Sequence, residues 1–239
     1  MHHTTQAIIL KKVIYGEADF IVTFFGRDEG RTSGIAKHAR ASQRRFGGAL
    51  ELGSIVDIRY TVRQSSDIVR IEDAHVDIPT IGIMQSLERI GAVSKALELA
   101  LAFLPASQPS PEKFDLLKGH IKNLAKQDPT PSSIISYELK WLSYVGYQPS
   151  LEHCVVCESQ IEQTNLWSFS VDHGGIICQN CSSPKIRKIN LKDRTLNGMR
   201  SLAQGTYIKL EQEDSHVIQG LLMHFVQHIL GRPLHVRTL

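Results

Sequence analysis

The sequence lacks any long apolar run. Its apolar stretches fall far short of the roughly 20 residues that a membrane-spanning helix needs, and charged residues interrupt them throughout. The segment Met1–Ile9 also lacks the basic region, apolar core and small-residue cleavage site of a secretory signal. We therefore expect a soluble, cytoplasmic protein that makes no membrane contact.

Familiar catalytic motifs are missing as well. The sequence contains no GxxxxGK[ST] phosphate loop, no HExxH helix and no GxSxG nucleophile turn. Glu17 and Asp19 lie in a predicted turn, which explains these acids without catalysis. We expect a protein that is not an enzyme, and a metal-dependent RNA-modifying enzyme is the rival interpretation.

Charge of one sign is only slightly in excess. The 239 residues are 42% hydrophobic and 21% charged, a globular composition long enough for one large or two small domains. A net charge of +3 is too small to indicate a polyanionic partner. Its distribution is more informative, because Lys37, Arg40, Arg44 and Arg45 occur without an acidic residue among them, and His38 adds a fifth cation at lower pH. An anion-binding patch and a solvated surface loop explain this charge equally well.

Short β-rich runs separated by turn residues extend from Thr5 to about Val76. The runs are Ala7–Ile14, Phe20–Phe25, a run ending at Ile35, Ile55–Val62 and Ile68–Val76. Five short strands predict a small barrel, and the oligonucleotide-binding (OB) fold is the commonest five-stranded candidate. An SH3-like barrel fits the periodicity almost as well.

Helical periodicity follows the barrel. Apolar residues recur at helical spacing from Leu87 to Leu104. Ser110-Pro111 begins a further helix, because the hydroxyl can cap it and proline loses no hydrogen bond in the first turn.

The same device recurs later in the chain. Thr130-Pro131 begins a helix that ends at Gly146, and a last helix over Val217–Leu230 ends at Gly231. The fold class is therefore α+β and multi-domain. We expect an OB-fold barrel over 1–79, a helical domain in two parts over 80–150 and 185–239, and a cysteine-containing insert over 151–184.

Cysteine is scarce, and all four copies fall into two CxxC pairs, Cys154 with Cys157 and Cys178 with Cys181. A two-residue gap lets both thiolates of a pair point at one ion, and two pairs complete the tetrahedron that Zn²⁺ prefers. Four sulfur ligands leave no open position for substrate. We therefore predict one structural Zn²⁺ in a four-cysteine zinc finger.

Three other interpretations of the cysteines are weaker. Disulfides need an oxidising compartment, and a thioredoxin-like site uses one CxxC in a βαβ context. A zinc deaminase needs His-x-Glu and Pro-Cys-x-x-Cys, whereas His153 directly precedes Cys154 and no proline directly precedes either pair.

An N-terminal barrel and a late four-cysteine insert within helices resemble the RecO family of bacterial recombination mediators. Local motifs that span almost the whole chain carry the resemblance. In chain order they are Tyr15–Asp19 with Ile21–Thr23, Ala36–Arg40 with Phe46–Gly48 and Leu50, Tyr137–Leu139, Gly146–Pro149 with Leu151, Gly174-Gly175, and Gly231–Leu234. Three positions depart from the family pattern: His38 and Glu158 stand where glycine is usual, and Val236 replaces a usual serine.

The resemblance implies a protein of DNA repair and recombination. Such a protein binds single-stranded and double-stranded DNA, anneals complementary strands, and with RecR loads RecA onto gaps covered by single-stranded DNA-binding protein. It implies association with the nucleoid during repair. A zinc-stabilised protein adaptor without direct DNA contact is the alternative.

Two groups of residues are candidates for these contacts. Lys37, Arg40, Arg44 and Arg45 supply a cationic surface for phosphates, and Phe46 is the preferred base-stacking residue because its loop is polar. Arg31, Arg59, Arg63 and Arg70 are candidates to extend the surface. Lys118, Lys122 and Lys126 share a face if their helix is continuous, and they then offer a site for the acidic C-terminal tail of single-stranded DNA-binding protein. A plain solvated face is the alternative for these lysines.

Overall fold

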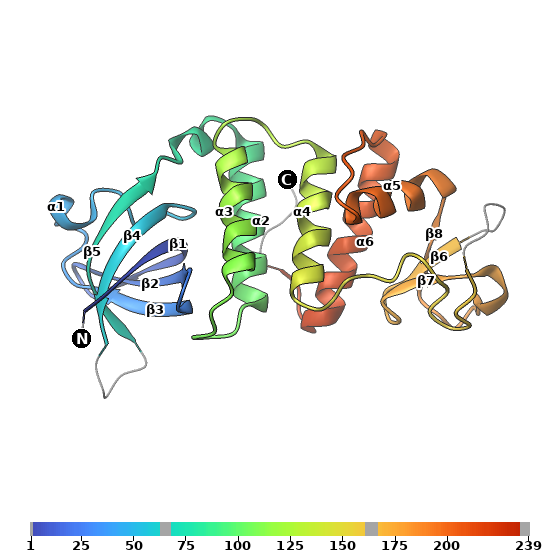
Figure 1. Cartoon of the computed structure of the whole chain (residues 1–239), viewed down its shortest axis with the longest axis horizontal. Helices are drawn as coiled ribbons and strands as arrows, with labels where there is room; N and C mark the ends of the chain where they lie inside the picture. Colours follow the sequence, from blue (N-terminus) through green and yellow to red (C-terminus); the bar gives the residue numbers. More distant parts are fainter. Residues whose placement is uncertain (1, 63–67, 161–166, 235–239) are drawn as a thin grey trace. The chain divides into compact units, whose positions relative to one another are not determined.

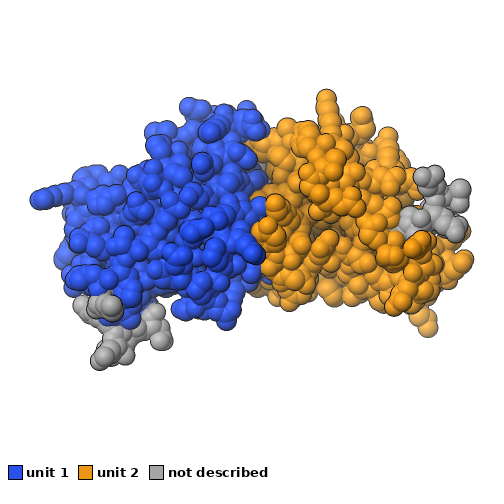
Figure 2. All heavy atoms as spheres, in the orientation of Figure 1, with its two compact units in different colours: residues 1–128, 236–239 blue, residues 129–235 orange. Residues whose placement is uncertain are grey.

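The computed structural model describes residues 2–62, 68–160 and 167–234. By compactness the chain forms two units, coloured separately in Figure 2: unit 1 is Met1–Asp128 with Val236–Leu239, and unit 2 is Pro129–His235. The finer division at residues 79, 150 and 184 stays a prediction. None of the described helices is both long and apolar enough to cross a bilayer.

Unit 1 begins with the expected five-stranded barrel (Figure 1). Its strands are β1 (His2–Tyr15), β2 (Asp19–Gly26), β3 (Gly30–Ala36), β4 (Ile55–Thr61) and β5 (Val69–Ile78). They are ordered β1-β2-β3-β5-β4, and β4 pairs back onto β1. All these pairs are antiparallel except β3 with β5. This order is that of an OB fold, so the prediction of an OB-like barrel is confirmed and the SH3-like alternative is not.

Alternating side chains build the barrel core. Ala7 and Ile9 from β1, Val22 and Phe24 from β2 and Ile58 from β4 all point inward. A close approach of β3 to β5 is possible only because residue 34 is glycine. A Cβ on Gly34 would lie 2.7 Å from Cγ1 of Ile71, well inside van der Waals contact.

Two long helices complete unit 1. A 3₁₀ turn, η1 (Ile81–Gln85), precedes α2 (Leu87–Phe103), and α3 (Pro111–Leu124) follows. Ser110 stands at the N-cap of α3 as predicted, but its side chain makes no capping hydrogen bond. Phe114 on α3 packs edge-on against Phe25 of β2 with ring centroids 5.5 Å apart. This contact anchors α3 on the barrel.

Unit 2 combines three helices with a small sheet. The elements are α4 (Pro131–Tyr144), β6 (Trp167–Ser170), β7 (Gly175–Ile177), the 3₁₀ turn η2 (Gln179–Cys181), β8 (Lys188–Leu191), α5 (Asp193–Ala203) and α6 (Gln212–Leu230). Thr130 and Ser133 form a reciprocal capping box at the start of α4. Gly231 ends α6 in the left-handed conformation, as predicted.

The sheet of unit 2 was not expected from the sequence. Its strand order is β7-β6-β8, and its strands are three or four residues long. Phe169 of β6 packs edge-on against Phe225 of α6 at 5.7 Å between ring centroids. The sheet therefore holds the cysteine-bearing loops against a helix.

Candidate metal centre and nucleic-acid interface

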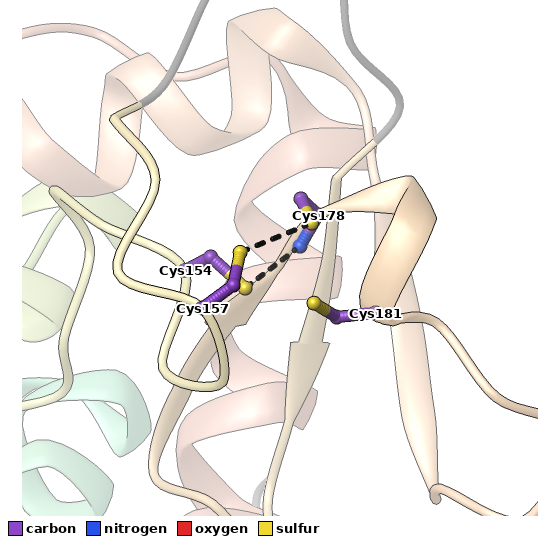
Figure 3. A group of neighbouring side chains, drawn as sticks. All are labelled: Cys154, Cys157, Cys178 and Cys181. Atoms are coloured by element: carbon purple, nitrogen blue, oxygen red, sulfur yellow. Dashed lines mark hydrogen bonds between the residues drawn. The ribbon is translucent and has the colours of Figure 1, made fainter.

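The four cysteines converge at one end of the small sheet (Figure 3). Cys154 and Cys157 lie in the loop between α4 and β6, whereas Cys178 directly follows β7 and Cys181 ends η2. Their four Sγ atoms all lie within 4.8 Å of one another. Residues separated by more than 20 positions in sequence thus form one cluster, which could bind a metal ion.

The spacing of the sulfur atoms fits a tetrahedral metal site. A tetrahedron with metal–sulfur bonds near 2.3 Å places its sulfur atoms about 3.8 Å apart. The Sγ atoms of Cys157 and Cys178 are 3.7 Å apart. A disulfide would need about 2.05 Å, and all four cysteines are free thiols.

Backbone geometry around the first pair shapes the site. Glu158 adopts the left-handed conformation with φ 60, and its N–H donates to the carbonyl of Cys154 at 2.8 Å. The N–H of Cys178 donates to Sγ of Cys154 at 3.4 Å. The N–H of Cys178 thus places positive partial charge beside the sulfur of Cys154, which favours its thiolate.

Two of the thiols have strongly shifted pKa values. Hydrogen bonds from the Ser159 side chain and backbone lower the pKa of Cys157 to about 6. Hydrogen bonds with Cys157 and Cys178 raise the pKa of Cys181 to about 12. Opposite directions are expected where neighbouring thiols share protons, because four thiolates together repel one another. A bound dication would remove that repulsion. The role of Ser159 carried no sequence signal beyond a hydroxyl two residues after Cys157.

The basic loop between β3 and β4 holds the predicted DNA-binding residues, and most of its cations have partners. Lys37 pairs with Asp19 at 2.6 Å, and Arg40 donates to the carbonyl of Glu17 at 2.7 Å. Arg45 donates to the carbonyl of Lys37 at 2.7 Å. Arg44 is exposed, and no hydrogen bond or ion pair joins it to another residue in the described parts of the chain.

Phe46 is buried although its loop is polar. Its side chain is only 3% exposed and belongs to the barrel core. The cause is α1 (Gln43–Phe46), a single helical turn that directs the last residue of the polar loop inward while Arg45 covers the ring, with its guanidinium carbon 5.0 Å from the ring centroid. Burial removes the reason for preferring Phe46 as the base-stacking residue, and its contact with DNA stays a prediction.

The arginines considered as extensions of this surface are largely neutralised. Arg59 forms an ion pair with Asp73, and Arg70 pairs with Glu72 at 3.3 Å. Arg31 is half-buried. Arg63 lies outside the described residues.

The three lysines do not share a helical face. Helix α3 ends at Leu124, so Lys126 lies beyond it. Lys118 donates to the side chain of Gln6 on β1 at 2.6 Å, and Lys122 is half-buried. The condition of a continuous helix is therefore not met at Lys126.

Comparison with known proteins covers nearly the whole chain. The family models described as Recombination protein O N terminal and Recombination protein O C terminal match residues 1–77 and 84–238. DNA repair protein RecO of Myxococcus xanthus is 30% identical over 96% of this chain and 93% of its own length. The protein of the same name from Anaeromyxobacter dehalogenans is 31% identical over 96% of this chain and 92% of its own. That of Geobacter metallireducens is 36% identical over 74% of this chain and 71% of its own.

Proposed function

The chain belongs to the RecO family and so has a role in DNA repair and recombination, and on that premise we propose that it is a recombination mediator that binds single-stranded DNA. This proposal rests on the exposure of Arg44. Its guanidinium lies on a loop of an OB-like barrel and has no partner among the described residues. An exposed guanidinium neutralises phosphate and releases counterions from the strand. Its neighbours Lys37, Arg40 and Arg45 hold the loop and add positive potential.

Strand annealing follows from the same surface. Two complementary strands repel each other, and a basic loop lowers that repulsion by screening their phosphates. We infer that the protein brings complementary strands together. It then also binds the double-stranded DNA that annealing produces. Because the interaction is electrostatic, affinity for single-stranded DNA falls steeply as salt rises.

The metal in this proposal is one Zn²⁺ per chain. Cys154, Cys157, Cys178 and Cys181 would hold it, and four thiolates are a ligand set that favours zinc over harder cations. A Zn²⁺ held by these four thiolates would cross-link two loops and would have no position left for a substrate. The cysteines, Ser159 and the N–H groups of the cluster then serve folding, and we propose no catalytic step.

Partners follow from the family. We propose that the protein acts with RecR to load RecA onto strands covered by single-stranded DNA-binding protein. Lys118 and Lys122 on α3 are the proposed contacts for the acidic C-terminal tail of that protein, with Lys126 just beyond the helix. Charge reversal tests this: Lys122→Glu weakens binding of a tail peptide, and unchanged affinity would exclude Lys122.

The alternative function is a zinc-stabilised adaptor that binds proteins and not DNA. It is favoured by the internal partners of Lys37, Arg40 and Arg45, because Asp19 neutralises Lys37 and backbone carbonyls occupy N–H donors of the two arginines that could otherwise bind phosphate. Fluorescence anisotropy of labelled single-stranded DNA separates the two functions. A mediator binds at low salt and anneals complementary strands, whereas an adaptor leaves the anisotropy unchanged.

A further inference from the structure

A hollow of about 290 Å³ opens beside the basic loop, within unit 1. Among the residues that line it are Lys12, Phe20, Arg40, Gln43 and Glu51. We propose that this hollow is a nucleotide subsite in which one base of a single strand stacks on Phe20. The inference rests on the proposed single-strand binding and identifies the aromatic residue that such binding needs.

The strand register places Phe20 at the open end of the barrel. In the β1–β2 ladder Lys12 is opposite Val22 and Ile14 is opposite Phe20. Residues two apart on a strand share a face, so Lys12 and Phe20 lie on the same face as the buried Val22. Phe20 packs against the core yet remains half-buried, whereas Phe46, the other aromatic residue of the hollow, is fully enclosed. Phe20 therefore has ring surface that a base can reach.

The face of Phe20 already has an occupant. Nζ of Lys12 lies over the ring, 5.1 Å from its centroid. An ammonium in this position is attracted by the negative face of the ring, and a base stacks on that same face. In the free protein the Lys12 ammonium thus occupies the face of Phe20 on which a base would stack.

An exposed carboxylate holds Lys12 there. Nζ of Lys12 pairs with Oε1 of Glu51 at 2.6 Å, and the Glu51 side chain is 65% exposed. Such a pair is weak and exchanges readily. A phosphate that enters the hollow offers Lys12 a new partner, so that the ammonium moves from ring to phosphate and the base takes the vacated face.

Polar groups on the rim complete a nucleotide site. Gln43 is exposed, and no hydrogen bond joins its amide to another residue within residues 2–62, 68–160 and 167–234. An amide both donates and accepts, which suits the edge of a base. Arg40 adds a second cation. Stacking surface, amide and paired cations together favour a nucleotide over a bare anion.

The test compares two oligonucleotides of equal length, oligo(dT) and an abasic strand with the same phosphates, by anisotropy with the full-length protein. Phe20→Leu keeps an apolar side chain without the aromatic face. It should weaken oligo(dT) binding about tenfold, within the range of base–aromatic stacking, and leave abasic binding unchanged. Tyr15→Leu, at an exposed aromatic outside the hollow, is the matched control and should have no effect. Phe20→Trp should restore binding, with indole fluorescence quenched by oligo(dT).

Each other result has a definite meaning. Equal affinity of Phe20→Leu and wild type for oligo(dT) overturns the subsite, as does an equal loss on both strands. Thermal unfolding of Phe20→Leu near that of wild type separates lost stacking from lost folding, and Phe20→Trp provides the same separation independently. If wild type binds neither strand, the proposed function itself fails. Glu51→Gln frees Lys12 from its ion pair and should tighten oligo(dT) binding about threefold. The control Glu17→Gln removes the same charge elsewhere and should have a smaller effect. Equal effects of the two variants would overturn the proposed exchange of Lys12 between Glu51 and phosphate.

Discussion

The backbone N–H of His38 donates a 2.8 Å hydrogen bond to the Asp19 carboxylate, while His38 itself holds the left-handed conformation with φ 55. The same carboxylate pairs with Lys37. The loop after β3 is therefore tied to the start of β2 through one acidic side chain. His38 and Glu158, the two described departures from glycine in the family pattern, both have positive φ. Each residue therefore adopts a backbone conformation that glycine adopts readily and that strains a residue with a side chain.

Replacing His38 with glycine should relieve this strain. A non-glycine residue in the left-handed region destabilises the folded protein by roughly 1–2 kcal/mol. Glycine removes this strain, but part of the gain is lost because glycine gives the unfolded chain more conformational entropy. We expect His38→Gly to raise the free energy of unfolding by about 0.5–1 kcal/mol in urea denaturation. His38→Ala, which keeps the strain, is the control. A less stable His38→Gly would contradict the argument.

Acid should destabilise the protein through His120 on α3. Burial lowers the pKa of His120 to about 4, so the unfolded chain, with its ordinary pKa near 6.5, binds the proton more readily. The stability due to neutral His120 is present above pH 6.5 and is lost as pH falls toward 4. Between pH 7.5 and pH 5 we expect a loss of about 1–2 kcal/mol, reduced by the partial exposure of the side chain. Urea midpoints at both pH values measure it, and His120→Gln should show a smaller change.

Metal content should depend on every cysteine. Because the site needs four sulfur atoms, Cys178→Ala should lower zinc from one per chain to near zero by elemental analysis and should unfold the loops around β7. Ser182→Ala, next to Cys181 but outside the cluster, should keep its zinc. Wild-type protein that folds fully without metal would disprove a structural zinc site.

Arg44 and Arg45 should differ when replaced singly. Arg44→Ala removes an exposed cation, so it should weaken single-stranded DNA binding severalfold and reduce the salt slope by about one, with no change in Tm. Arg45→Ala also removes the bonds to Lys37 and Ser42, so it should lower the free energy of unfolding by about 1 kcal/mol as well. Anisotropy over a salt series measures the first effect and thermal unfolding the second. Identical behaviour of the two variants would refute the distinction.

The features predictable from the sequence were those with local signals. Strand alternation, turn glycines, helical spacing and proline-started helices identified the barrel and helices α2, α3, α4 and α6, with most boundaries within two residues, whereas α5 was missed. The CxxC spacing predicted that Cys154 and Cys157 lie close together, because only two residues separate them in the chain. Gly231 marked the end of α6 for a similarly local reason.

The features that the sequence did not predict depend on packing between segments that are distant in the chain. Phe46 follows four polar residues, and only the four-residue α1 turns its ring into the core formed by other strands. Strands β6, β7 and β8 are too short to show alternation, and they form by pairing across gaps in the sequence. Phe20 looked like part of a buried run, and its partial exposure arises from the open end of the barrel.

The late position of β5 has a consequence during synthesis. It pairs in parallel with β3 and antiparallel with β4, so both strands keep a bare edge until Ile78 has left the ribosome. A nascent chain that stops at Thr61 therefore displays two open edges to neighbouring chains on the same messenger. Slow translation over residues 62–78 would lengthen that exposure and favour aggregation of the newborn polypeptide.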